Sequence, residues 1–235
     1  MVTCIDVRSE PLRRAIEARG GGRWTTLGFA GFFGVPLRFR PVGADGGTDR
    51  CPVLLRPRNT VAEVDVSREL EQPRRRRAAL AAAWHRAETG LVTPFALAEA
   101  SGVVMAGLAG LRSVAPRAPW WQHDEGAGEL DVEAGFTLDE QVYLAEASLR
   151  TMGLVDGFAR LVVLTGHGAS TTNNPFGSGY GCGACGGHDG AVSARAMARV
   201  LGSPAVREGL RARGIDVPDD TVVVAALHDT TRDTV

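Results

Sequence analysis

Lysine is absent from the sequence. All 26 basic residues are arginine, and they face 27 acidic residues, so the formal net charge is −1. Because no excess of positive charge is available to neutralise phosphates, the composition argues against a nucleic-acid-binding protein. We attribute the use of arginine alone first to genomic base composition, and only second to a need for guanidinium groups.

Long apolar runs are also absent. No stretch of about 18 uninterrupted apolar residues is present, so the sequence predicts no transmembrane segment. The nearest candidate covers residues 90–111 and contains Pro94 and Glu99, which favours a packed helix. The N-terminus lacks the basic and then apolar pattern of a signal peptide.

Cysteine is scarce, with four residues in 235. Four cysteines do not make a disulfide framework in a chain of this size, so a reducing cytosol is the expected compartment. For Cys51 and Cys185 we expect simple burial, because a free cysteine behaves as a small hydrophobic residue.

Apolar segments alternate with helical patterns, which predicts an α/β fold with a mainly parallel sheet flanked by helices. Thr137 and Glu140 form a capping box that opens one of these helices. The expected strands cover residues 2–7, 51–55, 161–165 and 222–227, and the expected helices cover residues 9–19, 67–88, 137–152, 191–201 and 203–214.

We expect residues 1–235 to form a single α/β domain, with residues 60–155 as a helical insertion. Both ends look cut, so the chain is expected to be a section of a longer protein. Residues 115–128 read as a loop. For the four consecutive arginines at residues 74–77, a solvated helix face is favoured over contact with an acidic partner.

Chemically active side chains follow the predicted strands. Cys4 and Asp6 are two residues apart in an extended segment, so they point to the same face. His167 follows one buried strand, and His228 with Asp229 follows another. Because ligands of open α/β sheets bind outside the carboxyl ends of the strands, these side chains are expected at one edge.

Cys182 lies in a glycine-rich loop, residues 166–187, ahead of a predicted helix whose N-terminus would favour a thiolate. Cys4, Asp6, His167 and Cys182 then make a tetrahedral set that suits zinc. The spacing of Cys182 and Cys185 also permits a thiol redox pair. His188 is the closest competing ligand, but a solvent-facing role is favoured.

Several motifs occur together, at residues 4–10, 28–34, 51–55, 164–170, 173–175, 182–187 and 226–231. Together they closely resemble the DabA family of bacterial inorganic-carbon transporter subunits. It is strong over residues 1–57 and 160–235 and weaker between them.

The resemblance implies a core related to β-carbonic anhydrases, whose Cys-x-Asp-x-Arg motif reads here as Cys4, Asp6 and Arg8. It implies Zn²⁺ held by Cys4, Asp6, His167 and Cys182. It also implies a membrane-embedded partner similar to DabB and to proton-translocating antiporter subunits, with CO2 and bicarbonate as substrates. The expected location is the cytoplasmic face of the cell membrane, as a peripheral protein.

Asp6 and Arg8 are the candidate catalytic residues. With Asp6 bound, zinc has four protein ligands; if the carboxylate moves to Arg8, a position opens for water, whose zinc-lowered pKa allows attack on CO2. For Arg8 the alternatives are an ion pair with Glu10 or a helix-capping role. His228 and Asp229 are expected to support the ligands or line the pocket.

Three functions remain open from the sequence. The first is a zinc-dependent subunit of a carbon-uptake complex, with carbonic-anhydrase-like hydration only when coupled to its partner. The second is a stand-alone β-carbonic-anhydrase-like hydratase. The third is a thiol redox protein using Cys182 and Cys185, which would leave Cys4, Asp6 and His167 without a role.

Overall fold

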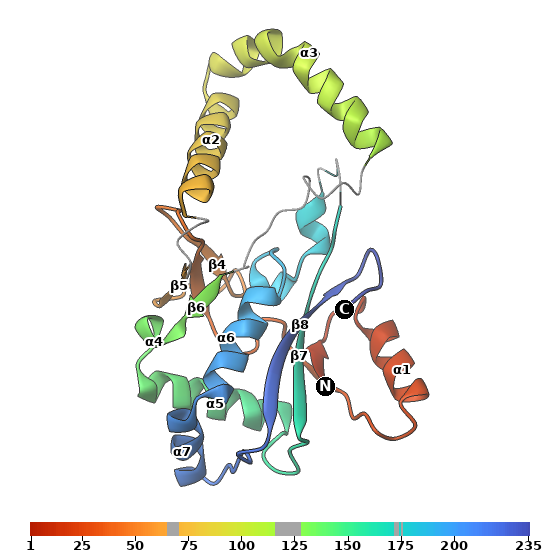
Figure 1. The fold of residues 1–235 in the computed structure, drawn as a ribbon, viewed down its shortest axis with the longest axis vertical. Helices are drawn as coiled ribbons and strands as arrows, with labels where there is room; N and C mark the ends of the chain where they lie inside the picture. The colour runs from red at the N-terminus through yellow and green to blue at the C-terminus, as the bar shows by residue number, and fades with distance from the viewer. Residues whose placement is uncertain (65–70, 116–127, 172–173, 175) are drawn as a thin grey trace. The chain divides into compact units, whose positions relative to one another are not determined.

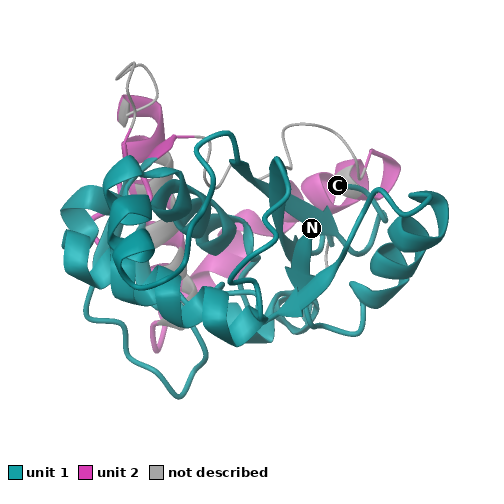
Figure 2. Cartoon of the chain, turned by 90° about the horizontal axis from the view of Figure 1, so that it is seen from below, with its two compact units in different colours: residues 1–40, 47–63, 130–235 teal, residues 41–46, 64–129 magenta. Residues whose placement is uncertain are grey.

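A computed structural model describes the chain except for residues 65–70, 116–127, 172–173 and 175. The chain divides into two compact units, residues 1–40, 47–63 and 130–235 in unit 1 and residues 41–46 and 64–129 in unit 2 (Figure 2). The elements of unit 1 are β1 (Val2–Cys4), α1 (Glu10–Arg19), β2 (Leu27–Phe29), β3 (Leu37–Arg40), β4 (Thr48–Arg50), β5 (Thr60–Val64), β6 (Glu129–Asp131), α4 (Val132–Gly135), α5 (Leu138–Met152), β7 (Leu161–Gly168), η2 (Gly177–Tyr180), η3 (Gly183–Cys185), α6 (Ala191–Gly202), α7 (Pro204–Ala212) and β8 (Val222–Asp229). Two of these, β5 and β6, each extend by one residue into unit 2.

The first sheet has the strand order β2-β1-β7-β8, and every neighbouring pair in it is parallel. The long strands β7 and β8 run side by side in Figure 1. This confirms the predicted α/β class with a mainly parallel sheet. Because all four strands run the same way, their carboxyl ends share one edge of the sheet.

The strands β7 and β8 are longer than the sequence predicted. Pairing continues through Gly166 with Leu227 and through His167 with His228. His167, His228 and Asp229 therefore lie inside the strands, and the prediction that they follow the strand ends is wrong. Gly166 permits a close approach of Gly190, since a Cβ there would lie 2.5 Å from the carbonyl carbon of Gly190.

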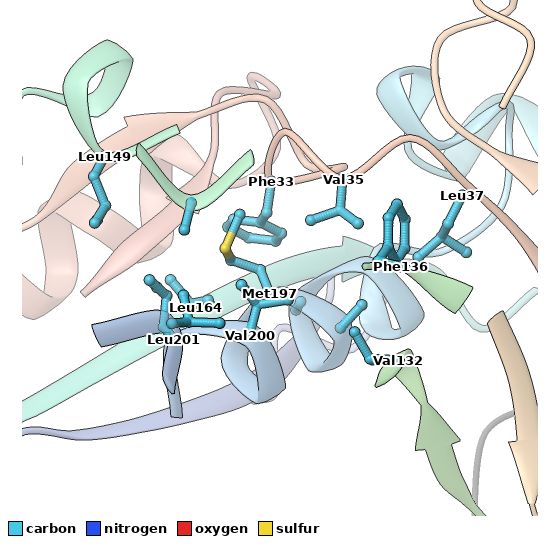
Figure 3. Packing of buried hydrophobic residues seen from close by; sticks show 14 of the residues in the cluster. Phe33, Val35, Leu37, Val132, Phe136, Leu149, Leu164, Met197, Val200 and Leu201 are labelled. Atoms are coloured by element: carbon cyan, nitrogen blue, oxygen red, sulfur yellow. The ribbon is translucent and has the colours of Figure 1, made fainter. Parts of the chain in front are cut away.

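Helix α6 packs on β7 and β8, α5 contacts β2, and α7 packs on α5 and α6, so the three helices share one apolar core with the sheet. The predicted capping box is confirmed: Thr137 accepts from the backbone N–H of Glu140, and the Glu140 side chain accepts from the backbone of Thr137. In Figure 3, Leu149 of α5, Leu164 of β7 and Met197 of α6 meet Phe33 in one core.

The second sheet, β4-β3-β5-β6, pairs β3 antiparallel with β4 and parallel with β5. The predicted strand at residues 51–55 is wrong. This segment forms a turn, in which the N–H of Leu55 donates to the carbonyl of Pro52 at 2.8 Å. Proline supplies no N–H for a strand ladder, which explains the difference.

Unit 2 contains α2 (Glu71–Thr89) and α3 (Thr93–Val114), which contact each other. One described helix is long and apolar enough to cross a membrane: the stretch Thr93–Leu111 of α3, with a mean hydropathy of 1.5. A helix was predicted here, but as a packed one, and none of this stretch is buried against the described chain. Most of the predicted loop at residues 115–128 lies outside the described residues. The treatment of residues 60–155 as an insertion into one domain stays a prediction.

Candidate metal centre

Three side chains that are far apart in the sequence converge at the carboxyl edge of the first sheet. Cys4 ends β1, His167 lies near the end of β7, and Cys182 directly precedes η3. One ligand atom from each, two sulfurs and an imidazole nitrogen, lie within 4.8 Å of one another. All three residues are buried, so the group could hold a metal ion away from bulk water.

The geometry of this group fits a tetrahedral metal. The Sγ atoms of Cys4 and Cys182 are 3.9 Å apart, and two sulfurs at about 2.3 Å from a tetrahedral zinc are about 3.8 Å apart. Both ring nitrogens of His167 are buried without a hydrogen-bond partner among the described residues. A buried polar atom without a partner is costly, and coordination of one nitrogen would relieve half of that cost.

The two thiols have raised pKa values in the metal-free chain. The hydrogen bond with Cys182 and burial raise the pKa of Cys4, while a contact with Cys185 and burial raise the pKa of Cys182 to about 12. The effect of the following helix on the Cys182 thiol stays a prediction. A bound cation reverses this balance, since a coordinating thiol is deprotonated.

The turn that carries Cys182 is built by backbone hydrogen bonds and glycines. The carbonyl of Cys182 accepts from the N–H groups of Cys185, at 2.9 Å, and Gly187, at 3.0 Å, and the N–H of Cys182 donates to the carbonyl of His188. Gly187 has a φ of +85°, a conformation that other residues rarely adopt. The turn thus fixes the direction of the Cys182 side chain before any metal binds.

Gly31 is the residue at the centre that the sequence did not single out by itself. A Cβ at this position would lie 2.5 Å from Sγ of Cys182 and 2.8 Å from Sγ of Cys4. The glycine-aromatic segment at residues 28–34 had been expected to pack tightly beside a core or cavity. The structure confirms the tight packing and identifies the two sulfurs as its partners.

We therefore expect Gly31→Ala to weaken metal binding about 10-fold or more, because one sulfur must move out of position. Isothermal titration of the reduced chain with zinc would measure this. Gly183→Ala is the matched control, since a Cβ there meets no atom within 4 Å. Equal zinc affinity in the two variants would contradict the close packing of Gly31 on the thiols.

Asp6 lies beside the three ligands but is bound to Arg8. Nε of Arg8 donates to Oδ1 of Asp6 at 2.7 Å, and Nη2 donates to Oδ2 at 2.8 Å. The hydrogen bond from Arg8 holds the pKa of Asp6 at about 2. Oδ2 is also 3.5 Å from Nε2 of His167. The carboxylate is thus adjacent to a candidate ligand while Arg8 holds it, and its role as a fourth ligand stays a prediction.

The guanidinium of Arg8 is itself held by the loop before Cys182. Nη1 donates to the carbonyl of Gly179 at 3.3 Å, and Nη2 to that of Gly181 at 3.4 Å. Cζ lies 6.0 Å from the centre of the Tyr180 ring, within the range of a cation–π contact. Arg8 therefore connects β1 to the loop that carries Cys182.

The alternative ion pair between Arg8 and Glu10 is not formed, since Glu10 pairs with Arg13 and Arg14.

The remaining cysteines and His188 lie outside the three-residue group. Cys185 is fully buried with its Sγ 3.9 Å from Oγ of Ser193, and Cys51 is buried with its Sγ 3.7 Å from the carbonyl of Leu55. Their predicted burial is confirmed. All four cysteines are free thiols. His188 is half-buried and is not among the residues that come together.

His228 and Asp229 end β8, next to the strand that carries His167. His228 is buried and pairs in register with His167, and its Nε2 lies 3.1 Å from Oδ1 of Asp233. Oδ1 of Asp229 instead accepts hydrogen bonds from the backbone N–H of Ser170 at 3.3 Å and from that of Thr231 at 3.0 Å. Asp229 therefore ties the end of β8 to the segment after β7.

This bonding predicts a dependence of stability on pH. Burial raises the pKa of Asp229, but the hydrogen bonds from Ser170 and Thr231 outweigh it and lower the pKa to about 2. An unfolded aspartate titrates near pH 3.9, so the stabilisation is complete above about pH 4 and is lost as the pH falls to about 2. We expect Asp229→Asn to cost about 1–3 kcal/mol at pH 7. Urea unfolding of the unchanged chain and of the Asp229→Asn variant from pH 7 to pH 3 tests this. The same difference in free energy of unfolding between them at every pH would contradict it.

Comparison with known proteins identifies the family of this chain. A family model described as "Probable inorganic carbon transporter subunit DabA" matches residues 1–235. Curated relatives of that description include proteins from Jannaschia sp., 46% identical over 99% of this chain and 28% of the relative, and from Bradyrhizobium sp. strain BTAi1, 44% identical over 99% of this chain and 30% of the relative. A Legionella pneumophila relative is 40% identical over 100% of this chain and 33% of its own length.

The chain thus spans about a third of the length of the curated relatives it matches. No solved structure matches it. The family model and the relatives both cover essentially all of the residues that form the metal centre and the two sheets. This chain belongs to the DabA family of inorganic carbon transporter subunits.

Proposed function

We propose that this chain is the zinc-containing part of a complex that takes up inorganic carbon by converting CO2 to bicarbonate. The convergence of Cys4, His167 and Cys182, with Asp6 held beside them by Arg8, is the observation that carries the proposal. Membership of the DabA family supplies the substrate class, because its curated members are named as inorganic carbon transporter subunits.

Zinc is the metal that the donor atoms favour. Two thiolates and one imidazole are the soft and intermediate ligands that select zinc, and three protein ligands leave a fourth position open. A zinc ion in such a site supplies a water whose pKa is near 7, the nucleophile needed for CO2. All three of these side chains are buried.

Asp6 and Arg8 control access to the fourth position in this proposal. Arg8 holds both carboxylate oxygens of Asp6 and so keeps the carboxylate away from the metal ligands. When the contacts of Arg8 with Gly179, Gly181 and Tyr180 loosen, Asp6 is free to occupy the fourth position and close the site. The two side chains then act as a gate.

The partner and the direction of the reaction rest on the family rather than on contacts. The word "subunit" in the names of the relatives implies a complex. We propose a membrane-embedded, antiporter-like partner similar to DabB, whose ion gradient drives hydration in one direction. The chain would then lie at the cytoplasmic face of the membrane as a peripheral protein.

A thiol redox function has less support than the zinc centre. Redox-active cysteines have lowered pKa values, whereas the pKa of Cys182 is raised to about 12. That function also gives no role to His167, whose two ring nitrogens are buried and have no hydrogen-bond partner among the described residues. A hydratase that needs no partner is distinguished by uncoupled CO2 hydration in the purified chain.

The proposal is tested in a chimera in which this chain replaces the matching segment of its Jannaschia relative. The chimera is produced with the relative's membrane partner in a bacterium that lacks its own carbonic anhydrases and needs added CO2. We expect growth in air with the chimera and none with a His167→Ala version. A zinc-loaded, membrane-associated chimera that gives neither growth in air nor bicarbonate accumulation would contradict the proposed function.

A further inference from the structure

Helix α3 presents apolar side chains to solvent along its whole length. Phe95 is 74% exposed, Val103 is 89% exposed and Val104 is 62% exposed, although each is a residue that folding normally covers. Leu111 and Val114 continue this surface at the C-terminal end. Contiguous exposed apolar surface of this kind marks a contact with another molecule or with a membrane.

The apolar surface surrounds the helix instead of forming one stripe. Successive residues of a helix are turned by about 100°, so Phe95, Val103, Val104 and Met105 point in four different directions. Glu99 is the one acidic or basic residue between Thr93 and Leu111. A helix that docks into a protein groove keeps a polar face toward water, whereas an all-round apolar helix needs apolar surroundings on every side.

The glycines of α3 support the same conclusion. Gly102, Gly107 and Gly110 lie inside the helix, and a Cβ at any of them would meet no atom within 4 Å. No packing within the described chain therefore requires these glycines, and each weakens a helix in water. Glycine is tolerated and more frequent in helices that lie in a bilayer.

The neighbouring helix α2 carries the positive charge that a membrane surface attracts. Four consecutive arginines occupy residues 74–77, and Arg75, Arg76 and Arg86 are exposed. Clusters of at least four arginines beside an apolar or amphipathic helix bind anionic lipid headgroups. The solvated face predicted for these arginines is compatible with a place among hydrated headgroups.

We propose that α3 enters the apolar layer of a lipid bilayer and that the arginines of α2 bind anionic headgroups at its surface. The 22 residues of α3 are about 33 Å long at 1.5 Å per residue, close to the thickness of the hydrocarbon layer. This inference rests on the membrane location in the proposed function and changes it from contact with the membrane surface alone to an inserted helix. It does not involve the metal ligands.

Vesicle flotation of the whole chain tests the inference. The probes are vesicles of phosphatidylcholine alone and vesicles of phosphatidylcholine mixed with phosphatidylglycerol. We expect the chain to float with both and more strongly with the anionic mixture. Val103→Glu with Val104→Glu should weaken partitioning about 100-fold or more. Arg75→Gln with Arg76→Gln should weaken it about 10-fold, with the anionic vesicles only.

Val53→Glu with Leu54→Glu is the matched control, because these two residues are 84% and 92% exposed on a loop of unit 1. Flotation equal to that of the unchanged chain is expected for it. Circular dichroism and zinc content measured on every variant show that it is folded and separate a failure here from a failure of the metal centre.

Two outcomes would overturn the inference. One is a folded chain that stays at the bottom of the gradient with both kinds of vesicle. The other is flotation that the α3 substitutions leave unchanged. A concentration-dependent oligomer in sedimentation equilibrium, abolished by Val103→Glu with Val104→Glu in a chain that never floats, would assign α3 to contact between copies of this chain.

Discussion

A Cys182→Ala chain is expected to bind no zinc under conditions in which a Cys185→Ala chain keeps about one zinc per chain. The two residues lie three positions apart, and both are fully buried. Only Cys182 places its sulfur within 4.8 Å of the ligand atoms of Cys4 and His167, whereas Cys185 points its sulfur toward Ser193. Loss of one of the ligands should lower the zinc affinity about 100-fold or more.

Mass spectrometric metal analysis, after gel filtration of the reduced chains with a weak chelator, measures this difference. Circular dichroism shows whether each variant is folded. Cys51→Ala is a second control, because its thiol is buried elsewhere and contacts the carbonyl of Leu55. Equal loss of zinc from the Cys182 and Cys185 variants, or a folded starting chain without zinc, would remove the ligand assignment and favour the redox pair.

The sequence predicted this centre because its signals are local. Cys4 stands at the end of an apolar strand, and Cys182 stands in a glycine-rich turn directly before the short helix η3. The parallel arrangement of the strands then brings both to one edge, which follows from alternation of strands and helices. The capping box at Thr137 is local for the same reason, since its donor and acceptor are three residues apart.

Features that depend on tertiary contacts could not be predicted. Nothing in the sequence gives the distance from Gly31 to the two sulfurs, because it depends on how the segment after β2 crosses β1. Tyr180 is one aromatic residue in a long loop, and its place over Arg8 appears only when β1 and that loop meet. His167 continues β7 through its pairing with His228 of β8, which no local periodicity records.

The exposure of α3 was missed for a related reason. An apolar helix of this length reads as a core helix when Pro94 and Glu99 interrupt the pattern, and sequence alone does not say which surface covers it. In the structure the described residues do not cover this helix, as the exposed fractions of Phe95 and Val103 show. Composition therefore predicted the helix correctly and its environment incorrectly.

An Arg8→Ala chain is expected to keep its zinc and to lose CO2 hydration about 100-fold or more, measured by ¹⁸O exchange in the Jannaschia chimera with its partner. Without the guanidinium, Asp6 loses both of its charge-assisted hydrogen bonds. Its carboxylate, 3.5 Å from His167, is then free to occupy the fourth position and keep water out. The hydration rate of an Arg8→Lys chain should lie between those of the unchanged chain and the Arg8→Ala chain, because an ammonium group cannot bind both carboxylate oxygens as a guanidinium does.

The double variant Asp6→Ala with Arg8→Ala separates a gate from a structural role. If Arg8 acts by holding Asp6 away, removal of the carboxylate reopens the position and the double variant should recover part of the hydration that Arg8→Ala loses. If Arg8 serves only to join β1 to the loop at Gly179 and Gly181, the second substitution should restore nothing. A gate predicts that the Arg8→Ala chain has a closed site that still holds its zinc. Unchanged hydration in this chain, or loss of its zinc, would therefore show that the Asp6–Arg8 pair is not the gate.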